Sequence, residues 1–255
     1  DASGARQRIL PEDKKDKIID VDKIKYEISK IARIPEITLN KTEKEKVVNL
    51  DQKIKNYIFG QDSAVHVISR SVQVSKAGLR DKNKPNGSYL LTGPTGTGKT
   101  ELCKVLSNEL EIPLHRFDMS EYTEQHTVSR LIGAPPGYVG HNEQNGLLAD
   151  AIDNSPYSII LLDEIEKAHP NIFDVLLQIM DYGKLTNGKG KTIDCSNIFL
   201  IMTSNLGAYE ITKEKIGFYV TDSDNSNSYD DAIKKSFSPE FRNRLDSVVT
   251  FNTLT

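Results

Sequence analysis

Residues 88–100 read S-Y-L-L-T-G-P-T-G-T-G-K-T, a short apolar run followed by a glycine-rich loop that ends in Lys-Thr. After the loop, apolar residues recur at helical spacing, at Leu102, Val105, Leu106 and Leu110. The stretch therefore predicts a buried strand, a loop and a helix in succession. Phosphates bind well at such a place, because the loop points backbone N–H groups inward and the helix N-terminus favours negative charge.

Each type of residue in the loop has a predicted part in holding a nucleotide triphosphate. The glycines allow the tight turn, the lysine reaches the β- and γ-phosphates, and the threonine hydroxyl ligates Mg²⁺. The predicted nucleotide-binding residues of the loop are Gly93, Pro94, Thr95, Gly96, Thr97, Gly98, Lys99 and Thr100. By average residue usage the pattern occurs by chance in about 1% of chains this long, so the predicted strand and helix around it strengthen the interpretation.

Composition and charge restrict the class of protein. The chain has 255 residues, 37% of them hydrophobic, so it can bury a substantial core. A net charge of −3 gives no reason to expect a nucleic-acid binder, and the sequence contains no apolar run long enough to predict a membrane span. Cys103 and Cys195 are expected to be small buried side chains in a reducing compartment. Because the sequence starts without Met, we expect an excised piece of a longer chain.

From residue 88 onward, short apolar segments alternate with amphipathic ones, which is typical of a parallel sheet with helices on both faces. Two helical patterns lie within 46–80, and Asp62 or Ser63 is expected to cap the second. Residues 1–45 are highly charged and are expected to form short helices and a linker. The predicted strands are 88–92, 113–118, 158–163, 197–203 and 247–251, with a hairpin over 183–195 that turns at Asn187-Gly188.

Two acids, Asp163 and Glu164, directly follow the apolar run 158–162. A buried strand of a parallel sheet delivers such residues to the edge where ligands bind. We expect Asp163 to hold Mg²⁺, directly or through water, and Glu164 to polarise an attacking water. The alternative is a strand that simply ends in solvated acids, and the phosphate loop upstream disfavours it.

Two further polar residues are candidates for the same site. Asn205 follows the apolar run 198–202 and is placed to bond a γ-phosphate or to orient water, although Ser-Asn also begins turns. Arg244 is either a finger inserted into a neighbouring subunit or a surface arginine paired with Asp246.

Taken together, the motifs resemble the AAA+ superfamily, and more closely the second ATPase module of the Clp/Hsp100 unfoldases, its ClpA-like members in particular. The motifs are G-P-T-G-T-G-K-T, L-L-D-E-I-E-K-A-H-P, M-T-S-N and F-S-P-E-F-R-N-R-L-D, with D-M-S-E-Y (118–122) and L-I-G-A-P-P-G-Y-V-G (131–140) especially specific. The resemblance runs from about Ile31 to Thr255. It implies the α/β fold of a P-loop NTPase, with 1–45 as the end of a preceding ATPase module and linker, and 46–255 as the AAA+ large subdomain.

The resemblance also implies a role for each candidate residue. Lys99 and Thr100 bind phosphate and Mg²⁺, Asp163 supports the metal, Glu164 is the catalytic base and Asn205 corresponds to sensor 1.

Three more positions match the family outside the phosphate loop. Ile58 and Phe59 match positions that line the adenine pocket, and Arg244 matches the finger that acts in trans. A finger in trans implies a ring of subunits, hexameric in this family. The family continues into a small helical domain with a sensor-2 arginine, which this sequence lacks, so we expect this piece alone to bind and hydrolyse ATP weakly.

Two segments are candidates for contact with other proteins. Tyr138 and Val139, between two glycines, fit either a packed corner or an exposed apolar tip, and the resemblance implies a pore loop that grips substrate. Ile216, Gly217 and Phe218 fit either a local anchor or a docking tripeptide, and the resemblance implies docking on a ClpP-type peptidase.

The predicted function is an ATP-dependent unfoldase that threads polypeptides through a ring into a ClpP-type peptidase. Its cofactors are ATP or ADP with Mg²⁺, and its partners are copies of itself, the peptidase, an adaptor and unfolded or tagged proteins, without nucleic acid or membrane. The alternatives are a disaggregase that works without a peptidase and a nucleotide-gated scaffold with little turnover. A bacterial cytoplasm is the expected location, with a plastid stroma as the alternative.

Overall fold

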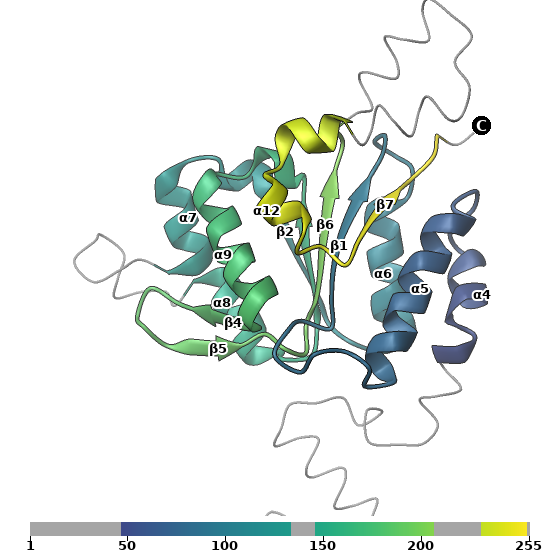
Figure 1. Cartoon of the computed structure of the whole chain (residues 1–255), viewed down its shortest axis with the longest axis horizontal. Coiled ribbons are helices and arrows are strands. Elements are labelled where there is room, and N and C mark those ends of the chain that lie inside the picture. The colour runs from purple at the N-terminus through teal and green to yellow at the C-terminus, as the bar shows by residue number, and fades with distance from the viewer. Residues whose placement is uncertain (1–46, 134–145, 207–230, 254–255) are drawn as a thin grey trace, which may run out of the picture.

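The computed structural model describes residues 47–133, 146–206 and 231–253, and within them the chain folds around a parallel sheet. The strands lie in the order β2-β3-β6-β1-β7 (Figure 1), and every neighbouring pair is parallel. Their bounds are Gly87–Thr92 for β1, Leu114–Asp118 for β2, Ile159–Asp163 for β3, Phe199–Ser204 for β6 and Ser247–Thr250 for β7. The predicted α/β class is confirmed, and each predicted strand overlaps an observed one.

The central strands are buried on both faces, which explains their continuous apolar sequence. All residues of β1, β3 and β6 are buried. Because side chains alternate along a strand, successive residues belong to different halves of the core. Leu90 and Leu162 pack in one apolar cluster, and Leu91 and Leu161 pack in the other.

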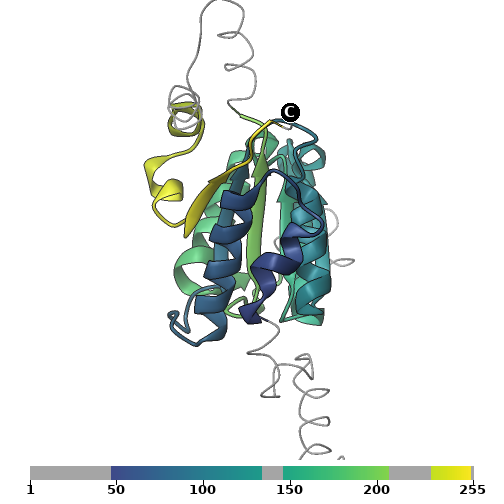
Figure 2. The ribbon, with the colours of Figure 1, turned by 90° about the vertical axis from the view of Figure 1, so that its right-hand side faces the viewer.

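Helices cover both faces of the sheet, as Figure 1 shows, and Figure 2 turns the face covered by α4, α5 and α6 toward the viewer. The first face is covered by α4 (Leu50–Lys55), α5 (Asp62–Lys76) and α6 (Lys99–Leu110). The second is covered by α7 (Gln125–Ile132), α8 (Leu147–Asn154), α9 (Pro170–Tyr182) and α12 (Pro239–Arg242). Two short 3₁₀ helices, η3 (Met119–Tyr122) and η4 (Ile165–Lys167), follow β2 and β3. The predicted helix after the phosphate loop is confirmed as α6.

The predicted hairpin is present, but its predicted turn is wrong. Strands β4 (Lys184–Thr186) and β5 (Thr192–Asp194) pair in antiparallel fashion. They are joined by residues 187–191 and not by a two-residue Asn187-Gly188 turn. Asn187 Oδ1 accepts the backbone N–H groups of Lys189 and Lys191, at 3.1 and 2.9 Å, and Gly190 takes the positive φ of 79°. The asparagine side chain therefore organises a longer loop, as Asx turns do.

The N-terminus of α5 also differs from the expectation. The cap residue is Gln61, its side chain makes no cap hydrogen bond, and Asp62 is already helical. The Gln61 side chain is instead buried against the end of β7. Its Nε2 donates to the Asn252 carbonyl at 2.8 Å, and its Oε1 accepts the Asn252 N–H at 2.9 Å. This pair joins segments that lie far apart in the sequence.

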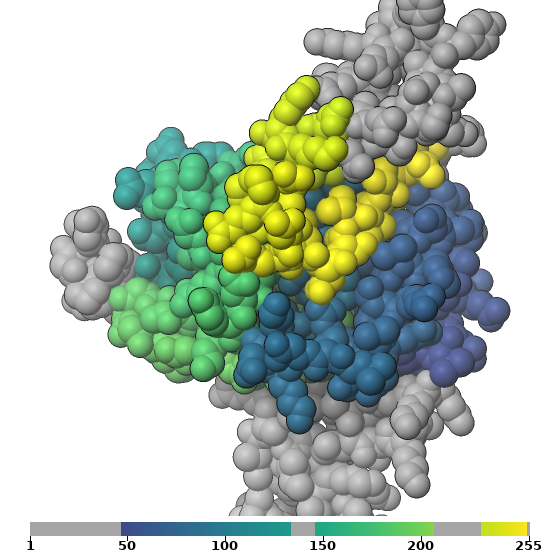
Figure 3. Space-filling view, viewed as in Figure 1, coloured from purple at the N-terminus to yellow at the C-terminus, as the bar shows by residue number. Residues whose placement is uncertain are grey.

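The segment after α12 is bound to the start of β1. Asp246 Oδ2 accepts the Ser88 N–H at 2.7 Å and its Oδ1 pairs with Arg80. Figure 3 shows this C-terminal part in yellow, against α9 in green and the chain before β1 in blue. Arg244 lies there too, and the alternative that it pairs with Asp246 is wrong. Its Nε lies 2.8 Å from Asp181 Oδ2 and its Nη2 lies 3.3 Å from Glu240 Oε1.

The expected burial of both cysteines is confirmed, because Cys103 and Cys195 are free thiols in the core. Burial raises the pKa of Cys195 to about 12, so this thiol is protonated at neutral pH. Among the helices in the described ranges, none combines the length and apolar character that a membrane crossing needs.

Replacing Gln61 by Ala leaves the Asn252 N–H and C=O without their partners, so we expect the free energy of unfolding to fall by about 1–3 kcal/mol. Urea denaturation followed by circular dichroism measures the change. Gln52→Ala, at an exposed position of α4, is the matched control and is expected to change it by less than about 0.5 kcal/mol. Equal losses in the two variants would contradict a structural role for the Gln61–Asn252 pair.

Candidate active site

The ends of β1, β2, β3 and β6 meet around one open pocket of about 420 Å³. Most of its lining comes from the first turn of α6, the phosphate loop before it and the residues at the carboxyl ends of the strands. The lining residues are Thr95, Gly96, Gly98, Lys99, Thr100, Glu101, Arg116, Asp118, Asp163, Glu164 and Asn205. The sheet thus brings together three predicted parts that are far apart in the sequence: the loop, the adjacent pair Asp163 and Glu164, and Asn205.

The phosphate loop depends on its glycines. Gly93, Gly96 and Gly98 have φ of 134°, 81° and 99°, a region that side chains disfavour. Gly93 is constrained twice, because an added Cβ would lie 2.4 Å from the carbonyl oxygen of Phe251. Gly98 caps α6 without a side-chain hydrogen bond to the first turn. The N-terminal N–H groups of α6 are therefore left to an anion.

Lys99 is held inside the pocket by three oxygen atoms. Its Nζ donates to the carbonyls of Gly93 and Pro94, at 2.6 and 2.9 Å, and to Asn205 Oδ1 at 2.8 Å. All three protons of an ammonium group are then used. Burial lowers the pKa of Lys99 to about 8, although Glu166, Asp163 and Glu164 act in the opposite direction.

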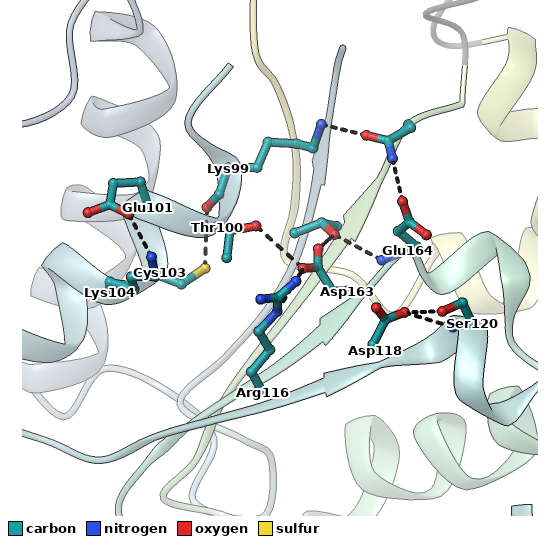
Figure 4. A network of polar contacts seen from close by, with 12 residues as sticks. Lys99, Thr100, Glu101, Cys103, Lys104, Arg116, Asp118, Ser120, Asp163 and Glu164 are labelled. Carbon is teal, nitrogen blue, oxygen red and sulfur yellow. Dashed lines mark hydrogen bonds and ion pairs between the residues drawn. The ribbon is translucent and has the colours of Figure 1, made fainter. Parts of the chain in front are cut away.

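Asp163 lies at the centre of the acidic side of the pocket, as Figure 4 shows. Its Oδ1 accepts the hydroxyl of Thr203, and this hydroxyl in turn accepts the Glu164 N–H at 3.0 Å. Its Oδ2 faces the Thr100 hydroxyl at 3.5 Å and carries an ion pair with Arg116. Thr203 therefore fixes the carboxylate so that one oxygen points toward Thr100.

Glu164 has a backbone conformation that is rare for its residue type. Its φ is 57° and its ψ is 52°, in the left-handed region, and such strain is concentrated at functional positions. Its side chain accepts Asn205 Nδ2 at 3.1 Å and pairs with Lys167 Nζ. The carboxylate thus contacts both Asn205, beyond the end of β6, and Lys167 in η4.

Asn205 connects the loop to Glu164. Its backbone N–H donates to Glu166 Oε1 at 3.0 Å, which orients the residue. Its amide then accepts from Lys99 and donates to Glu164, so the hydrogen bonds run without a break from the phosphate loop to the acid after β3.

The donor set fits Mg²⁺. Thr100 and Asp163 offer a hydroxyl and a carboxylate oxygen, the hard ligands that this ion prefers. No group of three or more His, Cys, Asp or Glu residues within the described ranges is arranged to hold a metal. Mg²⁺ commonly takes one or two protein ligands and completes its shell with water and phosphate oxygens. Thr100 and Asp163 would hold the ion in this way.

The remaining predicted residues either do not line the pocket or fall outside the described residues. Ile58 is buried, and its Cδ1 lies 3.9 Å from the position of a Cβ on Gly98, whereas Phe59 is 73% exposed. Arg244 does not line the pocket. The predicted pore loop, Tyr138 and Val139, and the predicted docking tripeptide, Ile216, Gly217 and Phe218, fall outside the described residues.

Sequence reasoning assigned no role to Thr203, Glu166 or Arg116. Thr203 was detectable as a polar residue at the end of an apolar strand. Glu166 and Arg116 carried no signal of this kind, because their partners lie 39 and 47 residues away and only the strand pairing brings them close.

The comparisons with known proteins agree with the observed fold. The family of AAA domains of the Cdc48 subfamily matches residues 84–248. A ClpA homolog protein of Fuscovulum blasticum is 48% identical over the whole chain, which covers 32% of that protein. A chaperone protein ClpB of Vibrio vulnificus is 46% identical over 94% of the chain and 28% of that protein.

A solved structure is also similar over the whole of this chain. The closed state of Hsp104 with ATPγS and FITC casein has a TM-score of 0.81 and 38% identity, and covers 100% of this chain and 44% of that one. The chain spans about a third of the length of these curated relatives.

The pKa of Lys99 leads to a prediction about ligand binding. Below pH 8 the Lys99 amine is already protonated. Above pH 8 Lys99 must take up a proton when an anion binds, so the affinity for the anion falls as pH rises. Between pH 7 and 9 we expect the Kd for a nucleotide to rise about tenfold. Calorimetry in buffers of different ionisation enthalpy checks this by measuring the proton uptake. A Kd that stays constant to pH 9 would show that the free lysine titrates higher.

Proposed function

Since this chain belongs to the AAA domains of the Cdc48 subfamily, we propose that it is the ATP-hydrolysing module of a ring-shaped protein unfoldase of the Clp/Hsp100 group. ATP binds with Mg²⁺ at the phosphate loop, and its hydrolysis drives a polypeptide through the ring. One observation carries the proposal, the hydrogen-bonded chain from Lys99 through Asn205 to Glu164. These hydrogen bonds link the group proposed to bind phosphate to the group proposed to activate water.

The residues divide the chemistry between binding and water activation. Lys99 exchanges its carbonyl partners for the β- and γ-phosphates, and the N-terminus of α6 stabilises their charge. Thr100 and Asp163 would hold Mg²⁺, which would supply positive charge to the phosphates. Glu164 accepts a proton from the attacking water, and Asn205 orients this water beside it.

In the proposed ring, a neighbouring subunit supplies the arginine that a single chain does not bring to its own pocket. Arg244 is held by Asp181 on α9 and Glu240 on α12, outside its own pocket. This placement supports its assignment as the finger that stabilises transition-state charge in a neighbouring subunit. The proposed assembly is a hexamer.

Replacing Glu164 by Gln keeps the amide contact with Asn205 but removes the base. We expect ATP binding to persist while turnover by the full-length protein falls about 100-fold or more. Glu121→Gln, at an exposed position of η3, is the matched control and is expected to leave turnover unchanged. Normal turnover by Glu164→Gln would exclude Glu164 as the catalytic base. Absence of turnover in the wild type would favour the nucleotide-gated scaffold.

The unfolded polypeptide has two possible fates in this proposal. The relatives include both ClpA and ClpB proteins, so similarity alone favours neither delivery to a peptidase nor disaggregation without one. We propose delivery to a ClpP-type peptidase, supported by the tripeptide Ile216, Gly217 and Phe218. Tyr138 and Val139 form the proposed pore tip that grips substrate. The disaggregase that works without a peptidase is the second candidate, because a ClpB chaperone and Hsp104 are also among the similar proteins.

Phe218→Ala tests the choice between these two fates. We expect the full-length variant to hydrolyse ATP at the wild-type rate and to lose association with a ClpP-type peptidase, because an apolar anchor of the contact is removed. Size-exclusion chromatography with ATP and peptidase measures the association. Unchanged association would leave the disaggregase as the preferred function.

A further inference from the structure

Arg116 occupies the carboxylate oxygen that faces Thr100. Its Nε and Nη2 lie 2.9 and 2.6 Å from Asp163 Oδ2 (Figure 4). The same oxygen faces the Thr100 hydroxyl at 3.5 Å. The guanidinium therefore lies at the oxygen that Mg²⁺ requires in the proposed site, on which this inference rests.

The ion pair compensates a carboxylate that solvent hardly reaches. The side chain of Asp163 is 11% exposed, and its other oxygen is already used by Thr203. A buried charge is strongly unfavourable without a partner. Arg116, by contrast, is 54% exposed, so its guanidinium can leave the pair and stay hydrated. The more mobile member of the pair is the cation.

A second carboxylate lies beside the first, on the neighbouring strand. Asp118 and Asp163 are register partners between β2 and β3, and both line the pocket. Arg116 lies two residues before Asp118, on the same face of β2. Hydrogen bonds from Ser120 lower the pKa of Asp118, and the nearby charge of Arg116 adds to this effect. The bonds from Ser120 use only Oδ1, which leaves Oδ2 as an acceptor.

We propose that Arg116 is a built-in counter-cation for Asp163, and that it moves to Asp118 when Mg²⁺ and nucleotide bind. In the free protein, Arg116 keeps Asp163 neutralised and correctly oriented. In the loaded protein, the guanidinium pairs with Asp118 and remains beside the site. Arg116 is thus a positioning residue that sets how strongly nucleotide binding depends on Mg²⁺.

The test measures nucleotide binding and not turnover. The Kd of a fluorescent ADP analogue is measured for the full-length protein across a Mg²⁺ titration and in EDTA. The midpoint of the titration, called the half-effect below, is the Mg²⁺ concentration that produces half of the change in Kd. For Arg116→Gln we expect this concentration to fall about fivefold, because no cation competes with Mg²⁺ for Asp163. In EDTA we expect the Kd to rise about fivefold, because Asp163 now repels the phosphates. Arg130→Gln, at an exposed position of α7, makes the same chemical change and is expected to alter neither value.

Asp118→Asn is the second variant, and its expected effect has the opposite sign. The pair between Arg116 and Asp163 stays intact, so the Kd in EDTA is unchanged. The displaced guanidinium has no charged acceptor, so the Mg²⁺ concentration at half-effect rises. Because Asp118→Asn keeps the Arg116 ion pair, it tests the proposal even if Arg116→Gln fails to fold.

The outcomes separate this inference from the proposed function. A wild type that binds no nucleotide, with or without Mg²⁺, overturns the proposed function. A wild type that binds normally, with Arg116→Gln unchanged in both values, overturns the counter-cation. An equal loss of affinity with Mg²⁺ and in EDTA also overturns it, because Arg116 then contacts phosphate directly. An unchanged Mg²⁺ response in Asp118→Asn overturns the acceptor role of Asp118.

Discussion

Burial of β1, β3 and β6 on both faces is the constraint on which the rest of the structure depends. Apolar strands covered by helices leave room for charge only where the strands end. Because the strands are parallel, these ends lie at one edge. The pocket is formed there, between the first turn of α6 and Asp163, Glu164 and Asn205. A core that excludes water thus also concentrates the polar residues in one place.

Within the pocket, charged groups have partners from the chain itself. Lys99 is bound by two carbonyls and Asn205, Asp163 by Arg116, and Glu164 by Lys167. Binding of a nucleotide is therefore an exchange of partners, and affinity reflects the difference between the old contacts and the new ones. Asn205 contacts both Lys99 and Glu164, so it connects the phosphate loop to the acid after β3 within the pocket.

The position of Arg244 in relation to this pocket supports the proposed ring. The residue is anchored on α9 and α12, both of which cover the second face of the sheet. α6, whose N-terminus is the proposed phosphate site, lies on the first face. We propose that such a module presents Arg244 to one neighbour and its nucleotide site to the other. Under the proposed function, the sheet thus separates the two halves of an active site shared between subunits.

Most of the architecture and the principal site residues could be predicted from the sequence. Strand and helix periodicity, the glycines of the phosphate loop and the acids after β3 are signals contained within a few consecutive residues, and the structure confirms the elements they predicted. The sequence could not show that Gln61 binds Asn252, that 187–191 turn around Asn187, or that Arg116 and Thr203 hold Asp163. These contacts depend on sheet register and on side-chain reach between distant segments. Short-range patterns determined which groups the chain offers, and only tertiary packing decided which of them meet.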